Sequence, residues 1–258
     1  MKLIILYAFL AALNPLQISS AKLSPPKDNL SVTPRADAPL PVPVANSSSP
    51  PPPPANSSGP LVPLADSSTL PFAAQQALLT IPFKRNLLST LANAKGLFVP
   101  LMGILGGTFD ARIRILPGVD WQLIVLRIGK RADAPYVYSN NAIAASIMGM
   151  PMDKINSFDM DPDDIVQGKG PWSGRDRLIL RIVDEQLANR TNAEQTIKDA
   201  LEVLTVPELV ETLIIHGTYC TFAGVVRGLR VAEDSTAPGL VDVVRQIVTV
   251  NFVQPKEI

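Results

Sequence analysis

The chain of 258 residues has one cysteine, Cys220, and one histidine, His216. A single cysteine excludes an intrachain disulfide, and these two side chains cannot supply the four Cys or His ligands of a structural zinc site. Basic residues number 23 and acidic residues 23, so the formal net charge is zero. Because there is no basic excess to neutralise phosphates, nucleic acid is not an expected partner.

The first 21 residues have the composition of a secretory signal peptide. Lys2 gives a positive start, Leu3 to Leu13 is an apolar run, and Ser19-Ser20-Ala21 offers small residues for cleavage. An uncleaved membrane anchor is the alternative, but the run is shorter than the roughly 20 residues that span a bilayer. We therefore expect a protein that enters the secretory pathway and is secreted, with no stable membrane anchor.

Residues 22–71 are rich in proline and serine and include the run Pro50 to Pro54. Few large apolar side chains are present to offset the entropy of ordering, so we predict a disordered linker. Four N-glycosylation sequons begin at Asn29, Asn46, Asn56 and Asn189. The motif is short and arises by chance, but three copies in an exposed tail of a secretory protein favour modification.

From residue 72 to residue 258 the apolar residues recur with helical spacing. Prolines and capping residues mark helix starts, at Pro117 and at Thr205 followed by Pro207 and Glu208. The last apolar stretch, Leu240 to Val250, fits either a helix or a strand. Since no other segment alternates strongly enough for a sheet, the sequence predicts a single all-α domain over residues 72–258.

Two blocks of this region resemble the carboxymuconolactone decarboxylase family. The first is Gln122-Leu-Ile-Val-Leu-Arg-Ile-Gly129, followed by Pro135-Tyr-Val-Tyr-Ser-Asn-Asn141. The second is Asp176-Arg-Leu-Ile-Leu-Arg-Ile-Val-Asp-Glu185, which leads to Leu209-Val-Glu-Thr-Leu-Ile-Ile-His-Gly-Thr-Tyr219. Order, spacing and the intervening loop agree with the family over about residues 83–231.

The resemblance implies an alkylhydroperoxidase D-like helical fold, assembled as a homotrimer or hexamer. It also implies a cofactor-free enzyme for a small lactone or carbonyl-rich metabolite, acting by decarboxylation, isomerisation or cyclisation, as in fungal secondary metabolism. The motif's Glu and His are replaced here by Pro135 and Asn141, so the usual proton-transfer pair is missing. The cysteine pair of peroxidase relatives would fall at Ala134 and Val137, which excludes that chemistry.

His216, Tyr219 and Cys220 lie on one predicted helix, and His216 and Cys220 share a face because they are four residues apart. Histidine suits proton transfer near neutral pH, so His216 is a candidate general base that has moved from the motif position. Tyr219 would donate a hydrogen bond to a substrate oxygen, and Cys220 would line the site. The alternative is a buried histidine that bonds a backbone carbonyl beside a small buried cysteine.

Asn141 takes the place of the motif histidine, where its amide could orient a carbonyl but could not relay a proton. Tyr136 and Tyr138 are candidate substrate-binding residues. They are two residues apart and face different sides of a helix, so at most one would share a pocket with Asn141. The alternative for both tyrosines is core packing with a satisfied hydroxyl.

Charged residues within the apolar helices, such as Arg127, Arg181 and Glu185, are expected to form pairs, because a buried charge needs a partner. The acidic run from Asp159 to Asp164 lacks the glycine and glutamate of an EF-hand and is expected to be a solvated loop. A second functional hypothesis follows from the lost motif pair. The protein would then be a catalytically inactive secreted homologue that binds a small molecule or assembles with an active subunit.

Overall fold

The computed structural model of the protein describes residues 59–80, 84–110, 112–234, 241–242 and 245–246. In chain order the named elements are η2 (Ser67–Thr69), α2 (Phe72–Leu79), α3 (Asn86–Leu91), α4 (Phe98–Phe109), α5 (Gly118–Arg131), α6 (Pro135–Ile147), α7 (Met152–Ile155), α8 (Pro162–Val166), α9 (Gly174–Asn189), α10 (Glu194–Leu201) and α11 (Val206–Gly228). No strand occurs in these residues, so the predicted all-α class is confirmed for the described part of the chain.

Several predictions fall outside the described residues. These are the signal peptide, residues 22–58 of the linker, and the sequons at Asn29, Asn46 and Asn56. Of the stretch from Leu240 to Val250, which fits either a helix or a strand, the four described residues are helical.

Residues 59–71, which the composition assigns to the linker, make backbone contacts with the helical part of the chain. The amide of Leu61 donates to the carbonyl of Leu229 at 2.9 Å, and the amide of Ala65 donates to the carbonyl of Ser89 at 3.0 Å. These bonds place the start of the packed chain before the predicted boundary at residue 72.

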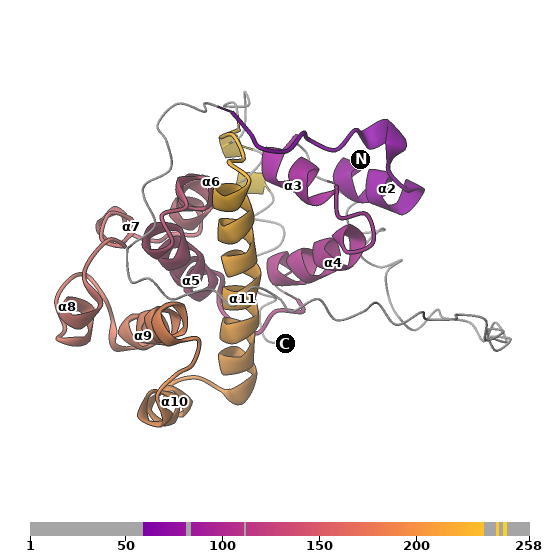
Figure 1. Ribbon diagram of the computed structural model, residues 1–258. Coiled ribbons are helices and arrows are strands. Elements are labelled where there is room, and N and C mark those ends of the chain that lie inside the picture. Colours follow the sequence, from indigo (N-terminus) through magenta and orange to yellow (C-terminus); the bar gives the residue numbers. More distant parts are fainter. Residues whose placement is uncertain (1–58, 81–83, 111, 235–240, 243–244, 247–258) are drawn as a thin grey trace, which may run out of the picture. The chain divides into compact units, whose positions relative to one another are not determined.

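Helix α5 is the central element, because ten of its residues are buried and it packs against α6, α9 and α11 (Figure 1). Asp120 lies in its first turn and Lys130 and Arg131 in its last, as the helix dipole favours. Gly129 permits the close approach of α6. A Cβ atom at this position would lie 2.9 Å from both Cβ and the backbone nitrogen of Tyr138.

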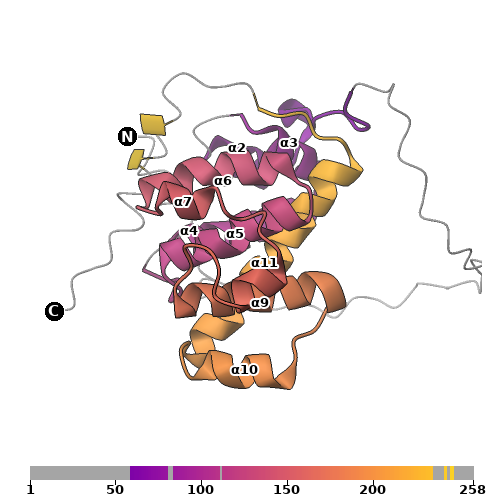
Figure 2. The same cartoon turned by 90° about the vertical axis from the view of Figure 1, so that its left-hand side faces the viewer.

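Two capping boxes fix the starts of α9 and α11, which lie on the other sides of α5 (Figure 2). The amide of Asp176 donates to Oγ of Ser173 at 3.1 Å, and the amide of Ser173 donates to the Asp176 carboxylate at 2.7 Å. Thr205 and Glu208 exchange the equivalent bonds at the start of α11. The predicted helix start at Thr205 is therefore confirmed.

The helix α11 is 23 residues long and apolar enough to cross a membrane by length and composition alone. The core helix of a soluble protein meets the same test, and much of α11 is buried among the other helices. The apolar stretch that contains Pro100, Gly103 and Gly106 forms the continuous helix α4. Pro100 falls in its first turn, where a missing N–H breaks no helical hydrogen bond.

The charges within the apolar helices are paired, as predicted. Arg127 is fully buried, and its guanidinium donates to both carboxylate oxygens of Asp184 at 2.8 and 2.7 Å. Arg181 donates to Glu185 at 3.1 Å, one turn along α9. The acidic run contains the short helix α8, which the solvated-loop prediction missed, because Asp161 caps its start.

Candidate functional site

The candidate site is centred on α11, where His216 and Cys220 face each other one turn apart. The Cys220 Sγ atom lies 3.4 Å from Nε2 of His216 and 3.9 Å from Nδ1. His216 is only 6% exposed, and Cys220 is half-buried. The shared face that the spacing predicts is therefore present, and it lies inside the protein.

The surroundings of this pair keep both side chains neutral. Burial lowers the pKa of His216, and the positive charge of Arg190 lowers it further. Burial raises the pKa of the Cys220 thiol, against a smaller opposing effect of Arg190. The pair is thus an imidazole beside a thiol at neutral pH, and it lacks the thiolate that nucleophilic catalysis needs.

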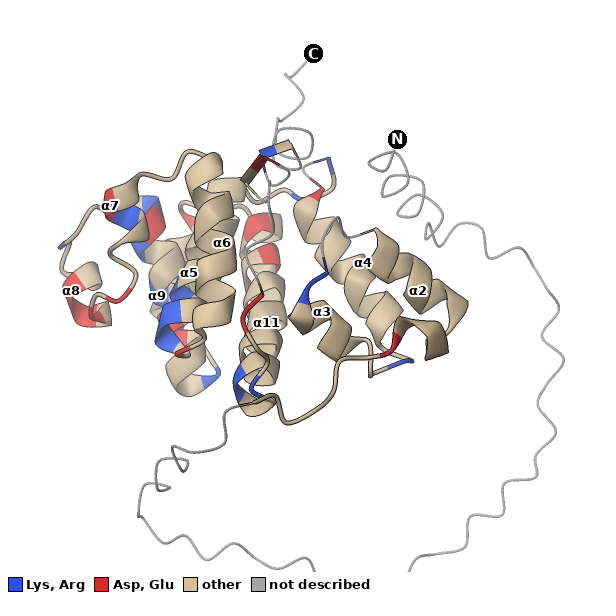
Figure 3. Ribbon diagram, turned by 90° about the horizontal axis from the view of Figure 1, so that it is seen from above, with Lys and Arg blue, Asp and Glu red and all other residues tan. Residues whose placement is uncertain are grey.

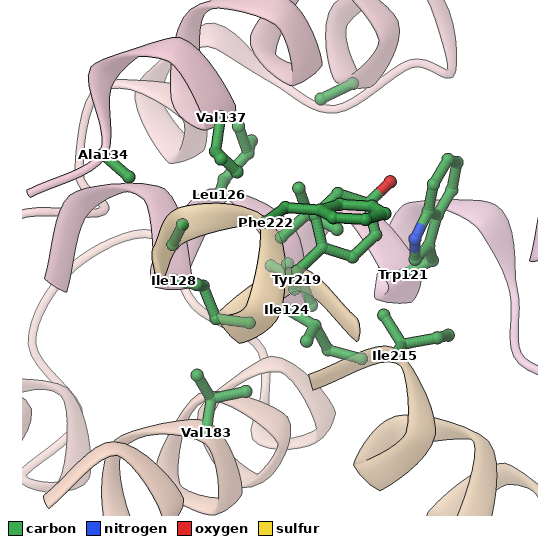
Figure 4. Packing of buried hydrophobic residues seen from close by; sticks show 14 of the residues in the cluster. Trp121, Ile124, Leu126, Ile128, Ala134, Val137, Val183, Ile215, Tyr219 and Phe222 are labelled. Carbon is green, nitrogen blue, oxygen red and sulfur yellow. The ribbon is translucent and has the colours of Figure 1, made fainter. Parts of the chain in front are cut away.

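Tyr219 is buried among other aromatic side chains of the core (Figure 4). Its ring centroid is 6.2 Å from that of Trp121 and 5.3 Å from that of Phe222, both in edge-to-face arrangements. Burial raises the pKa of the Tyr219 hydroxyl well above its ordinary value. The hydroxyl therefore remains protonated and is able to donate.

Asn141 lies on α6 and is half-buried. Its amide nitrogen donates to the carbonyl of Val137 at 2.8 Å, one turn back along the helix. An amide that donates to its own helix has less capacity to donate to a substrate carbonyl, which is the role that the sequence suggested.

The two candidate tyrosines of α6 face different sides, as their spacing predicts. The Tyr136 hydroxyl donates to the Asp234 carboxylate at 2.5 Å and accepts from the Leu87 amide at 3.3 Å. The Tyr138 hydroxyl donates to the carbonyl of Ile155 at 2.5 Å. Both hydroxyls are engaged within the fold, which is the arrangement that the core-packing alternative describes.

Gln122 is a residue of interest that the sequence analysis did not single out as a candidate. It is fully buried on α5, and neither its amide nitrogen nor its amide oxygen has a hydrogen-bond partner among the described residues. Gln122 and Gly129 are seven residues apart and so share a face of α5, and Gly129 meets Tyr138 of α6. A glutamine inside the apolar run Trp121-Gln-Leu-Ile-Val was the signal that could have identified it.

The remaining predicted residue, Asn189, is exposed at the end of α9, where a glycan has access to it. Within the described residues, no group of three or more His, Cys, Asp or Glu side chains could hold a metal ion. No protein-family model matches the chain, and neither a curated protein nor a solved structure matches it. The described site is thus a neutral His–Cys pair and an unpartnered buried carboxamide within an all-α domain.

Proposed function

We propose that this chain is a catalytically inactive homologue of the carboxymuconolactone decarboxylase-like enzymes that binds a small lactone or carbonyl-rich molecule. The observation that carries the proposal is the buried Gln122 carboxamide, which has no partner among the described residues. Such a group costs about 1–3 kcal/mol of stability unless a small polar molecule meets it. A carbonyl oxygen that accepts from Nε2 would satisfy the nitrogen of this carboxamide, and a carbonyl is the ligand class that the resemblance implies.

Three features support binding over catalysis. Pro135 and Asn141 stand where the family motif has its proton-transfer pair. Asn141 donates to its own helix, and His216, the one histidine of the chain, is buried beside a neutral thiol. A base in that position meets a substrate only if the substrate enters the core.

The proposal includes the alkylhydroperoxidase D-like fold, a homotrimeric or hexameric assembly and secretion. The order of the helices supports the fold, because α5 and α6 carry the first resembling block and α9 and α11 carry the second. Sedimentation velocity of the purified protein tests the assembly, and a monomer at all concentrations would contradict it.

Substitution Gln122→Met tests the binding role, because methionine fills a similar volume without polar atoms. We expect the free energy of unfolding of the variant, measured with denaturant, to rise by about 1–3 kcal/mol because the unpartnered amide is removed. It should also lose the chemical-shift changes that δ-valerolactone, used as a probe, causes in the wild type. Gln167→Met, the same change at an exposed position, serves as the control. Lactone binding that survives in Gln122→Met would contradict the proposal.

A second candidate is a cofactor-free isomerase, which the neutral His216 favours. Its imidazole would take a proton from the carbon beside a carbonyl, and the Tyr219 hydroxyl would donate to the resulting enolate oxygen. The imidazolium would then return the proton to another carbon, so that the substrate is rearranged without oxidation.

Hydrogen–deuterium exchange separates the two candidates. Lactone and ketone probes are incubated with the protein in heavy water, and NMR follows exchange at the carbon beside the carbonyl. The binding proposal expects no exchange above the rate without protein. If the wild type and Cys220→Ala catalyse the exchange and His216→Gln does not, the isomerase is established instead.

A further inference from the structure

The segment from Ser67 to Phe109 contains three cations, Lys84, Arg85 and Lys95, and no aspartate or glutamate. It includes helices α2, α3 and α4, none of which contains a charged residue. Figure 3 shows these helices without charge, whereas α7 and α9 carry both signs and α8 carries acidic residues. The charges of the described chain are therefore distributed unevenly.

Helices α2 and α4 pack against each other, and neither contains a charged residue. Phe72 and Leu79 are 75% and 73% exposed and, seven residues apart, share the outer face of α2. Leu97, the N-cap residue of α4, and Ile104 within the helix are 72% and 48% exposed. Large apolar side chains exposed together on uncharged helices indicate an interaction surface.

The cations at the ends of these helices indicate what covers the surface. Lys84 and Lys95 are exposed, and neither has an acidic partner within the described residues. Arg85, in contrast, is paired with Asp234. A symmetric pairing of two copies through this surface would bring patches of the same positive charge together. An anionic lipid surface takes apolar side chains into its acyl boundary and lysines among its headgroups.

We propose that the outer faces of α2 and α4, defined by Phe72, Leu79, Leu97 and Ile104, dock on an anionic membrane surface with Lys84 and Lys95 at the headgroups. This docking is peripheral, and it does not depend on the ligand that Gln122 binds. It places the charged helices α7, α8 and α9 outside the contact, since they offer no comparable uncharged face.

Co-sedimentation of the full chain with vesicles tests the proposal. Vesicles of phosphatidylcholine with phosphatidylserine are compared with vesicles of phosphatidylcholine alone. The double variant Phe72→Asp/Leu97→Asp should partition at least about tenfold more weakly than the wild type, because two apolar anchors become anions. Val166→Asp/Leu201→Asp makes the same change at two exposed apolar positions of α8 and α10, and should bind like the wild type.

A second variant, Lys84→Gln/Lys95→Gln, leaves the apolar surface intact. We expect it to lose about tenfold on the anionic vesicles and to match the wild type on phosphatidylcholine. Equal binding by the wild type and both surface variants would overturn the proposal, since another segment would then hold the membrane. A second result would also overturn the proposal: the wild type does not bind vesicles and forms a dimer, and Phe72→Asp/Leu97→Asp dissociates that dimer. The surface would then be the contact with a second copy.

Discussion

The Sγ atom of Cys220 lies 3.4 Å from Nε2 of His216, one helical turn away and inside the protein. Burial and the nearby charge of Arg190 lower the pKa of the imidazole in the folded state. The unfolded chain therefore binds a proton at a higher pH than the folded chain does. This contribution to stability is present above the unfolded pKa of about 6.5 and is lost as the pH falls towards the folded value.

We predict that His216→Gln flattens the pH dependence of stability just below pH 6.5, about the ordinary histidine pKa. The measurement is urea unfolding of wild type and variant across this range. Asp120 and Asp184 have raised pKa values because they are buried, so their titration changes stability in the opposite sense. An unchanged slope in His216→Gln would show that another group causes it.

Arg127, which is fully buried, and Asp184, whose side chain is 10% exposed, form a pair whose loss should be costly. Arg127→Met leaves the Asp184 carboxylate without its main partner, and it removes the donor to the carbonyls of Phe158 and Met160. We expect a loss of about 3–5 kcal/mol in chemical unfolding. The double variant Arg127→Met/Asp184→Leu should recover part of it, and additive losses would mean that the two side chains are not coupled.

Gly129→Ala tests the contact between α5 and α6. The added Cβ would lie 2.9 Å from the Tyr138 backbone nitrogen, which cannot move aside independently of α6. We expect a loss of about 1–3 kcal/mol from overpacking, although alanine is the better helix former. Gly217→Ala on α11 meets nothing within 4 Å and should gain up to about 1 kcal/mol. Thermal unfolding measures both variants.

Asp234 forms hydrogen bonds that connect the chain after α11 to the starts of α3 and α6. Its carboxylate accepts from the Asn86 amide at 2.7 Å, from Arg85 at 3.1 Å and from the Tyr136 hydroxyl. We predict that Asp234→Ala increases amide hydrogen exchange in α3 and in the first turn of α6. Asp242→Ala, at an exposed carboxylate, should leave both unchanged. Equal protection in the two variants would show that Asp234 is dispensable.

Asn189 is exposed, so its sequon is open to glycosylation. When the wild type is expressed through a secretory pathway, an N-glycosidase should reduce its mass. The mass that the enzyme removes from Asn189→Gln should be smaller by one glycan. The test also bears on the predicted signal peptide, because a chain that does not enter that pathway acquires no N-glycan.

The helix starts could be predicted from the sequence because the capping residues that mark them lie close together in the chain. Thr205, Pro207 and Glu208 lie within one turn, and the hydrogen bonds of the cap join those same residues. The pair Arg181–Glu185 was accessible for the same reason, since a spacing of four residues fixes the contact.

The candidate site was predicted only in part. The spacing of His216 and Cys220 placed them together, since both lie on one helix. The partners of Tyr136 and Tyr138 could not be predicted, because Asp234 and Ile155 reach them from other parts of the chain. Helical periodicity identifies a buried face, but it does not identify the side chain that packs against that face.

By itself, the sequence determined the all-α class and the capped helix starts, because each depends on residues close together in the chain. Only the tertiary structure decided that Gln122 is buried without a partner among the described residues and that Phe72 and Leu79 face outward. The physical reason is that burial and hydrogen bonding depend on which helices meet, and that is settled by the packing of the whole domain.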